Sequence, residues 1–122
     1  MPEPSNQFEP GSVVIRRADR EGGDGKLRSC VMTSSSERGR DAKAETVLVV
    51  PLTSDTDSKL RLPMPVITPD PSNGLVQLTA SMCGRVICIG KARLDQQIGT
   101  VHAQLLCRVR LGMAAVIGLT DL

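Results

Sequence analysis

The spacing of apolar residues changes once along this chain, from short runs typical of strands to a single helical period. Runs rich in Val and Ile, separated by Gly, Pro and polar residues, predict strands. From Val101 to Val116, apolar residues recur at steps of three or four, which predicts one helix of about 16 residues. The predicted strands lie at residues 13–15, 28–34, 46–50, 60–67, 75–79 and 85–89. Together these elements predict an α+β, mainly β domain, in which a compact barrel carries the C-terminal helix.

The length of 122 residues is enough for one domain with a modest core. Residues 1–10 are polar and rich in Pro, so they predict a flexible N-terminal tail before a single domain over residues 11–122. The longest apolar runs, residues 47–52 and 113–119, are far shorter than the roughly 18 residues of a membrane-spanning helix. We therefore expect no membrane association. Because the first ten residues hold no apolar run typical of a signal peptide, we expect a cytoplasmic location.

Proline, glycine and polar residues mark the expected boundaries. Pro51 cannot donate to a β-ladder, so we expect strand pairing to change there. Residues 69–74 predict a turn, and Thr100 and Gly118 are the expected N-cap and end of the helix. The expected loops are residues 16–26 and 35–44, and residues 94–98 are interpreted as a single helical turn.

The near absence of aromatic residues limits how the chain could bind nucleic acid. It has one Phe, Phe8, and neither Tyr nor Trp, which argues against base stacking on aromatic side chains. Any RNA contact must then rest on cations, backbone donors and shape. The net charge is only +2, but residues 85–110 hold five Lys or Arg and one Asp. A local basic face and an ordinary solvated face are both compatible with this segment.

The cysteines and the single histidine do not predict a metal site. Cys83 and Cys88 lack the spacing of a zinc site, and we expect Cys30, Cys88 and Cys107 to be buried thiols. One histidine excludes a ribonuclease that uses two histidines as acid and base. We expect His102 to be an exposed helical residue. No metal or other cofactor is predicted.

Several segments occur together in an order and spacing that resemble the MazF/PemK (Kid) toxin family of type II toxin–antitoxin systems. The resemblance covers roughly residues 10–120. Its most specific parts are the Val-Val-Pro-Leu-Thr-Ser and Lys-Ala-Arg-Leu segments. The matching segments are residues 10–14, 26–28, 47–54, 73–75, 89–94 and 98–99.

The resemblance implies an SH3-like β-barrel of the MazF/CcdB/Kid type with a C-terminal helix, and a homodimer. It implies a bacterial toxin that acts as a metal-independent, sequence-specific endoribonuclease on single-stranded RNA, including mRNA, and thereby inhibits translation and growth. It also implies neutralisation by a cognate antitoxin with an acidic, disordered tail. These properties are expectations of the resemblance.

The resemblance also assigns roles to individual residues. The family's catalytic Arg ends the first long loop, which is Arg28 here, and its catalytic Thr lies in the Pro-Leu-Thr segment, which is Thr53. Lys26, Ser54 and Arg85 are candidate RNA-binding residues. The chemistry suits these types, because RNA cleaved by its own 2′-OH passes through a phosphorane that needs a cation and hydrogen-bond donors.

Four positions depart from the family pattern. Ser12, Gly23 and Ser29 stand where members usually have Asp, Glu and Pro, and Arg16 stands where an aromatic residue is common. The alternative is therefore a binding module on the same barrel that is not a nuclease, either an inactive toxin homologue or a CcdB-like gyrase poison. The gyrase alternative is disfavoured, because such toxins end in a tail with a Trp and this chain has none.

Overall fold

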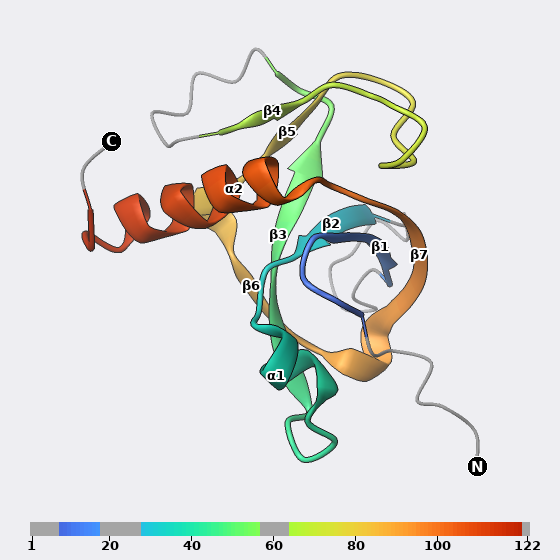
Figure 1. Cartoon of the computed structure of the whole chain (residues 1–122), viewed down its shortest axis with the longest axis vertical. Helices are drawn as coiled ribbons and strands as arrows, with labels where there is room; N and C mark the ends of the chain where they lie inside the picture. Colours follow the sequence, from blue (N-terminus) through green and yellow to red (C-terminus); the bar gives the residue numbers. More distant parts are fainter. Residues whose placement is uncertain (1–7, 18–27, 57–63, 121–122) are drawn as a thin grey trace.

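The computed structural model describes residues 8–17, 28–56 and 64–120, and its centre is a strongly curled antiparallel sheet (Figure 1). In these residues the C-terminal helix packs across the sheet, so the expected mainly β fold is confirmed. Lys26, residues 18–26 of the predicted loop 16–26 and the first half of the predicted strand 60–67 lie outside the described residues. The elements are β1 (Ser12–Arg16), β2 (Arg28–Met32), α1 (Ser36–Arg40), β3 (Thr46–Thr53), β4 (Val66–Ile67), β5 (Thr79–Ser81), η1 (Cys83–Arg85), β6 (Ile87–Gly90), η2 (Lys91–Arg93), β7 (Leu94–Thr100) and α2 (Ala103–Val116).

The long strand β3 organises the sheet. The strand order is β4-β5-β3-β2-β1-β7, and β6 also pairs with β3. Residues 46–49 of β3 pair with β6, whereas Leu52 and Thr53 pair with β5. Pro51 lies between the two pairings, which confirms the change of partner predicted there. The carbonyl oxygen of Pro51 accepts from the Met82 backbone N–H at 2.9 Å, at the start of η1.

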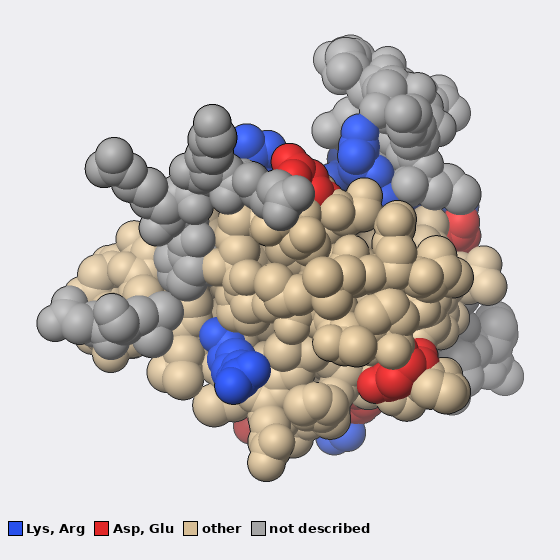
Figure 2. Space-filling model, turned by 90° about the horizontal axis from the view of Figure 1, so that it is seen from above, with Lys and Arg blue, Asp and Glu red and all other residues tan. Residues whose placement is uncertain are grey.

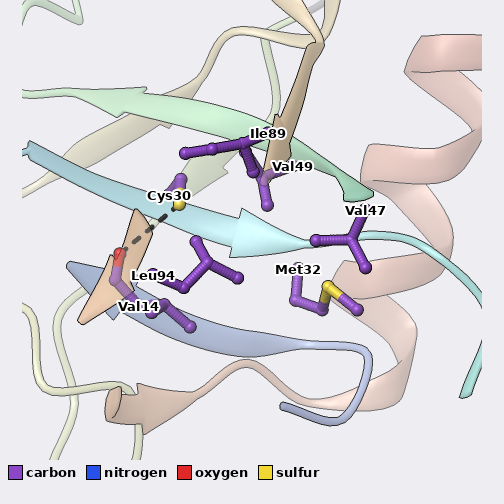
Figure 3. Packing of buried hydrophobic residues seen from close by; sticks show 7 residues of the cluster. All are labelled: Val14, Cys30, Met32, Val47, Val49, Ile89 and Leu94. Atoms are coloured by element: carbon purple, nitrogen blue, oxygen red, sulfur yellow. Dashed lines mark hydrogen bonds between the residues drawn. The ribbon is translucent and has the colours of Figure 1, made fainter. Parts of the chain in front are cut away.

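The core is built from aliphatic and sulfur-containing side chains on both faces of the curled sheet. Val14 belongs to an inner cluster enclosed by the strands, whereas its neighbour Val13 packs on the opposite face against residues such as Leu105 of α2. This alternation follows from the two-residue period of a strand. Phe8, at the end of the predicted tail, packs against the inner cluster. Figure 3 shows the inner cluster: Val14, Cys30, Met32, Val47, Val49, Ile89 and Leu94.

The helix α2 confirms the helical period, but its N-cap differs from the expected one. Thr100 is the last residue of β7, and its N–H donates to the Ser72 carbonyl at 2.8 Å. His102 is the N-cap instead, because its Nδ1 accepts from the Leu105 N–H at 3.2 Å. It is exposed but precedes the helix. Gly118 ends the helix with φ +83°, as predicted. No helix among the described residues is long and apolar enough to cross a membrane.

Three other predicted segments were wrong. Residues 94–98 form part of β7 rather than a helical turn, because their backbone pairs with β1. The expected loop 35–44 contains α1, whose first turn is capped by the Ser35 hydroxyl, which accepts from the Arg38 N–H. The strand expected over 75–79 begins only at Thr79.

The cysteines also differ from expectation. Cys30 and Cys83 are buried, whereas Cys88 and Cys107 are exposed. Cys107 lies on α2 among the residues that face away from the sheet, so its apolar neighbours in sequence do not cover it. The prediction of buried thiols was therefore wrong for Cys88 and Cys107.

Candidate functional site

A cleft of about 490 Å³ opens where β1 and β2 meet the end of β3. The segment between Gly74 and Thr79 and the short helix η1 form its other walls. Parts of the chain that are far apart in sequence therefore converge on one cavity. Its polar lining residues are Arg16, Arg28, Ser29, Thr53, Ser54, Gln77, Thr79 and Arg85.

Four of the five residues singled out from the sequence line this cleft. Arg28 is the first residue of β2, and Thr53 is the last residue of β3. Ser54 follows directly, and Arg85 ends η1. The fifth, Lys26, lies outside the described residues. The structure thus brings together side chains from three separate elements.

The hydroxyl of Thr53 is already oriented by its own loop. The Asp55 backbone N–H donates to Thr53 Oγ1 at 3.1 Å. A hydroxyl group has one hydrogen to donate and can accept two hydrogen bonds. Because the Asp55 contact uses an accepting position, the Thr53 hydrogen remains able to donate to a ligand oxygen.

The described lining of the cleft is cationic. It contains the three arginines Arg16, Arg28 and Arg85 and no Asp, Glu or His. Arg16 and Arg28 are direct partners in the β1–β2 ladder. Like charges that face each other across strands are destabilising. An anion in the cleft would reduce this repulsion, so the lining favours an anionic ligand.

Arg16 is the lining arginine to which the sequence analysis gave no role. The signal for it is the cross-strand register, which pairs Arg16 with Arg28. That register cannot be read from the sequence, because the strands are joined by a long segment rather than a two-residue turn.

The wall that begins at Gly74 is held by close backbone contacts. A Cβ atom at Gly74 would overlap the carbonyl of Ile98, and Gly74 has φ +71°. The side-chain oxygen of Asn73 accepts from the Leu75 N–H at 3.0 Å. A hydrogen bond from the Ser72 hydroxyl lowers the pKa of the Asp70 carboxyl in the same turn. These contacts fix the wall against β7.

Potential metal ligands do not gather at one place in the part of the chain that the structure describes. No cluster there holds three or more His, Cys, Asp or Glu residues. His102 lines a separate depression with Asp70 and Arg108 rather than the arginine-lined cleft. The site as described therefore offers cations and hydroxyl donors, and no imidazole.

Comparisons with known proteins agree with this architecture. Residues 9–117 match the family model described as "PemK-like, MazF-like toxin of type II toxin-antitoxin system". A comparison with curated protein sequences gave no match.

Solved structures with a similar fold include an "Endoribonuclease in complex with its cognate antitoxin from Mycobacterial species", with 21% identity, a TM-score of 0.65, and coverage of 94% of this chain and 97% of that one. The Mycobacterium tuberculosis toxin MazF-mt6 has 21% identity, a TM-score of 0.68, and coverage of 89% and 98%. A chain of the MazE–MazF crystal structure (Form-III) from Deinococcus radiodurans has 15% identity, a TM-score of 0.72, and coverage of 93% and 99%. At these identities the likeness concerns the fold.

Proposed function

Because the chain belongs to the PemK-like, MazF-like toxin family of type II toxin–antitoxin systems, we propose that it is a toxin that cleaves single-stranded RNA without a metal ion. Cleavage of mRNA at short sequence motifs would inhibit translation and growth. The observation that supports this proposal most is the convergence of Arg28 and Thr53 on one cleft. Toxins of this family are endoribonucleases.

In the proposed mechanism, the 2′-hydroxyl of the substrate loses its proton to water as its oxygen attacks the adjacent phosphorus. The bond from phosphorus to the 5′-oxygen breaks, leaving a 2′,3′-cyclic phosphate and, once the 5′-oxygen takes a proton, a 5′-hydroxyl end. The protein must stabilise the negative charge that grows on the phosphoryl oxygens. Donors aimed at such charge are typically worth about 3–4 kcal/mol each.

The residues of the cleft divide this work according to their chemistry. Arg28 supplies a guanidinium charge and a forked set of hydrogen-bond donors, so its role is to stabilise charge. Thr53 donates its hydroxyl hydrogen to a phosphoryl oxygen, while its oxygen accepts from Asp55. Ser54 and Arg85 contact neighbouring parts of the RNA, and Lys26 adds a further cation before β2.

The same proposal includes partners and a location. A cognate antitoxin with an acidic, disordered tail would occupy the arginine-lined cleft and compete with RNA. The toxin would act as a homodimer in the bacterial cytoplasm, where mRNA is translated. Residues 11–122 would form the single toxin domain, with residues 1–10 as its tail.

The experiment that tests the function is incubation of the purified protein with a long single-stranded RNA in EDTA. We expect cuts at a few sites, each leaving a 5′-hydroxyl end. DNA of the same sequence, which lacks the 2′-OH, should stay intact. Intact RNA with a folded protein would contradict the proposal and indicate a binding module, for which protein partners such as gyrase would be tested next.

A further inference from the structure

Arg16 occupies an unusual position in the cleft. It is the last residue of β1, it is half-buried, and it lines the cavity beside its ladder partner Arg28. Its Nε atom is buried without a hydrogen-bond partner among the described residues. Buried donors of this kind are nearly always satisfied by protein, water or ligand.

The neighbouring groups do not neutralise Arg16. The thiol of Cys30 lies close enough to feel its charge, yet burial raises the pKa of that thiol to about 12, so it stays uncharged. The carboxylate of Asp95 on β7 lies 4.0 Å from Nη2 of Arg17. Its partner is therefore the residue that follows Arg16, and not Arg16 itself. In the described part of the chain, Arg16 takes part in no ion pair. Arg16 is thus a half-buried cation that lies opposite Arg28 in the ladder and has no carboxylate partner of its own among the described residues.

We propose that Arg16 binds a second phosphate of the RNA strand, next to the phosphate that reacts at Arg28 and Thr53. The identity of this anion rests on the proposed function. An RNA strand carries a phosphate at every nucleotide, so a strand whose reacting phosphate lies against Arg28 presents another phosphate to the adjacent arginine. The guanidinium fork matches two phosphate oxygens. Bound RNA would then supply the negative charge that the described lining of the cleft does not hold, and Arg16 would fix the register of the strand.

Salt dependence tests this role, because each phosphate neutralised on a single strand contributes about −0.7 to the slope of log K against log[salt]. The probe is a single-stranded 2′-fluoro RNA, which keeps every backbone charge but cannot attack its own phosphate. The variant is Arg16→Met, which keeps an apolar stem. The matched control is Arg17→Met, which removes the same charge from an exposed residue outside the cleft.

We expect Arg16→Met to bind the probe roughly tenfold or more weakly and to lose about 0.7 from the slope. Arg17→Met should keep the wild-type slope, and Arg16→Lys should restore most of it. The melting temperature of Arg16→Met should equal or exceed that of the wild type, since an unsatisfied nitrogen and a like-charge contact are removed.

Two outcomes would overturn the inference: equal slopes for Arg16→Met and Arg17→Met, or no binding of the probe by the wild type. Cleavage of ordinary RNA by the wild type, assayed in parallel, reports on the proposed function separately. If the wild type cleaves RNA and the slopes are equal, the function stands and the second phosphate site fails. If the wild type cleaves nothing while Arg16→Met loses about 0.7 from the salt slope, the phosphate site stands and the nuclease proposal fails.

Discussion

Thr53 combines two hydrogen-bonding roles that require a hydroxyl group. Its oxygen accepts from the Asp55 N–H, which fixes the side chain, and its hydrogen can still be donated into the cleft. Arg28, which lines the same cleft, carries charge, so in the proposed reaction the two residues would give different kinds of stabilisation to one phosphate. Loss of either should therefore lower the rate of cleavage much more than the stability of the fold.

Replacing Thr53 separates the hydroxyl from the shape of the side chain. Thr53→Val keeps the branched shape but removes the donor, so we expect cleavage to slow roughly 100-fold. Thr53→Ser keeps the hydroxyl and should retain most of the activity. The measurement is the single-turnover rate on one mapped RNA site. A Thr53→Val rate close to that of the wild type would show that the hydroxyl takes no part in the reaction.

The thiol of Cys30 gives a prediction for alkaline pH. Burial raises its pKa from 9.0 to about 12, so between these values the unfolded state loses a proton that the native state keeps. Stability should therefore fall as pH rises above 9.

In the native protein near pH 8, a thiol reagent should modify Cys88 and Cys107 rapidly and Cys30 and Cys83 slowly. Mass spectrometry of the labelled peptides measures this, and equal labelling at all four would contradict the burial described here.

At the scale of single residues, the sequence indicated part of the cleft lining. Arg28 and Thr53 were singled out through a family resemblance, and both line the cleft. Arg16 was not, because its role depends on the register between β1 and β2. Gln77 and Met82 of the lining were missed for a similar reason, since they come from segments without a motif and meet the cleft only through the curl of the sheet.

Among the elements, the turn before β5 shows how backbone contacts shape the cleft wall. Gly74 has a positive φ and its Cα lies against the Ile98 carbonyl of β7. Asn73 bridges the turn through its side chain, which accepts from the Leu75 N–H and donates to the Thr68 carbonyl. The wall of the cleft thus depends on a glycine that carries no reactive group.

A pair of glycine substitutions tests this dependence. Gly74→Ala should lower the free energy of unfolding by about 1–3 kcal/mol, because the new Cβ meets backbone and φ is positive. Gly90→Ala is the control, since a Cβ there meets nothing within 4 Å. Chemical denaturation of both variants gives the comparison. Equal stability of Gly74→Ala and Gly90→Ala would contradict the close approach of the turn to β7.

Elements with a regular period could be predicted, and those shaped by irregular pairing could not. The helix α2 keeps one apolar stripe, and β3 is a dense run of β-branched residues, so each was evident. β7 was not, because its ladder to β1 has two register shifts that disturb the two-residue alternation. α1 has only five residues and no apolar stripe, so its Ser35 cap was the sole sequence signal.

For the whole molecule, exposed apolar side chains indicate a contact with a second subunit. Figure 2 shows a broad uncharged surface, with Lys and Arg widely separated on it. Large apolar side chains are exposed on several elements, and Val76, in the wall of the cleft, is 92% exposed. The other strongly exposed examples are Ile117 and Leu119, which directly follow α2. Contact with a second subunit would remove such residues from water.

We therefore predict that the protein is a homodimer at micromolar concentration. Burial of exposed apolar side chains stabilises a symmetric pair of small barrels. Sedimentation equilibrium over a range of concentrations measures the dissociation constant. A monomer at micromolar concentration would contradict this prediction, but it would leave the chemistry of the cleft untouched.

The measurement that tests the central claim most directly compares two arginine variants on one mapped RNA site in EDTA. Arg28→Ala removes the charge beside Thr53, whereas Arg17→Ala removes the same charge from an exposed residue outside the cleft. We predict that the single-turnover rate of Arg28→Ala falls about 100-fold or more, as for the loss of a key oxyanion donor, while Arg17→Ala cleaves at nearly the wild-type rate. Equal rates for the two variants would show that the arginine-lined cleft is not the site of RNA cleavage.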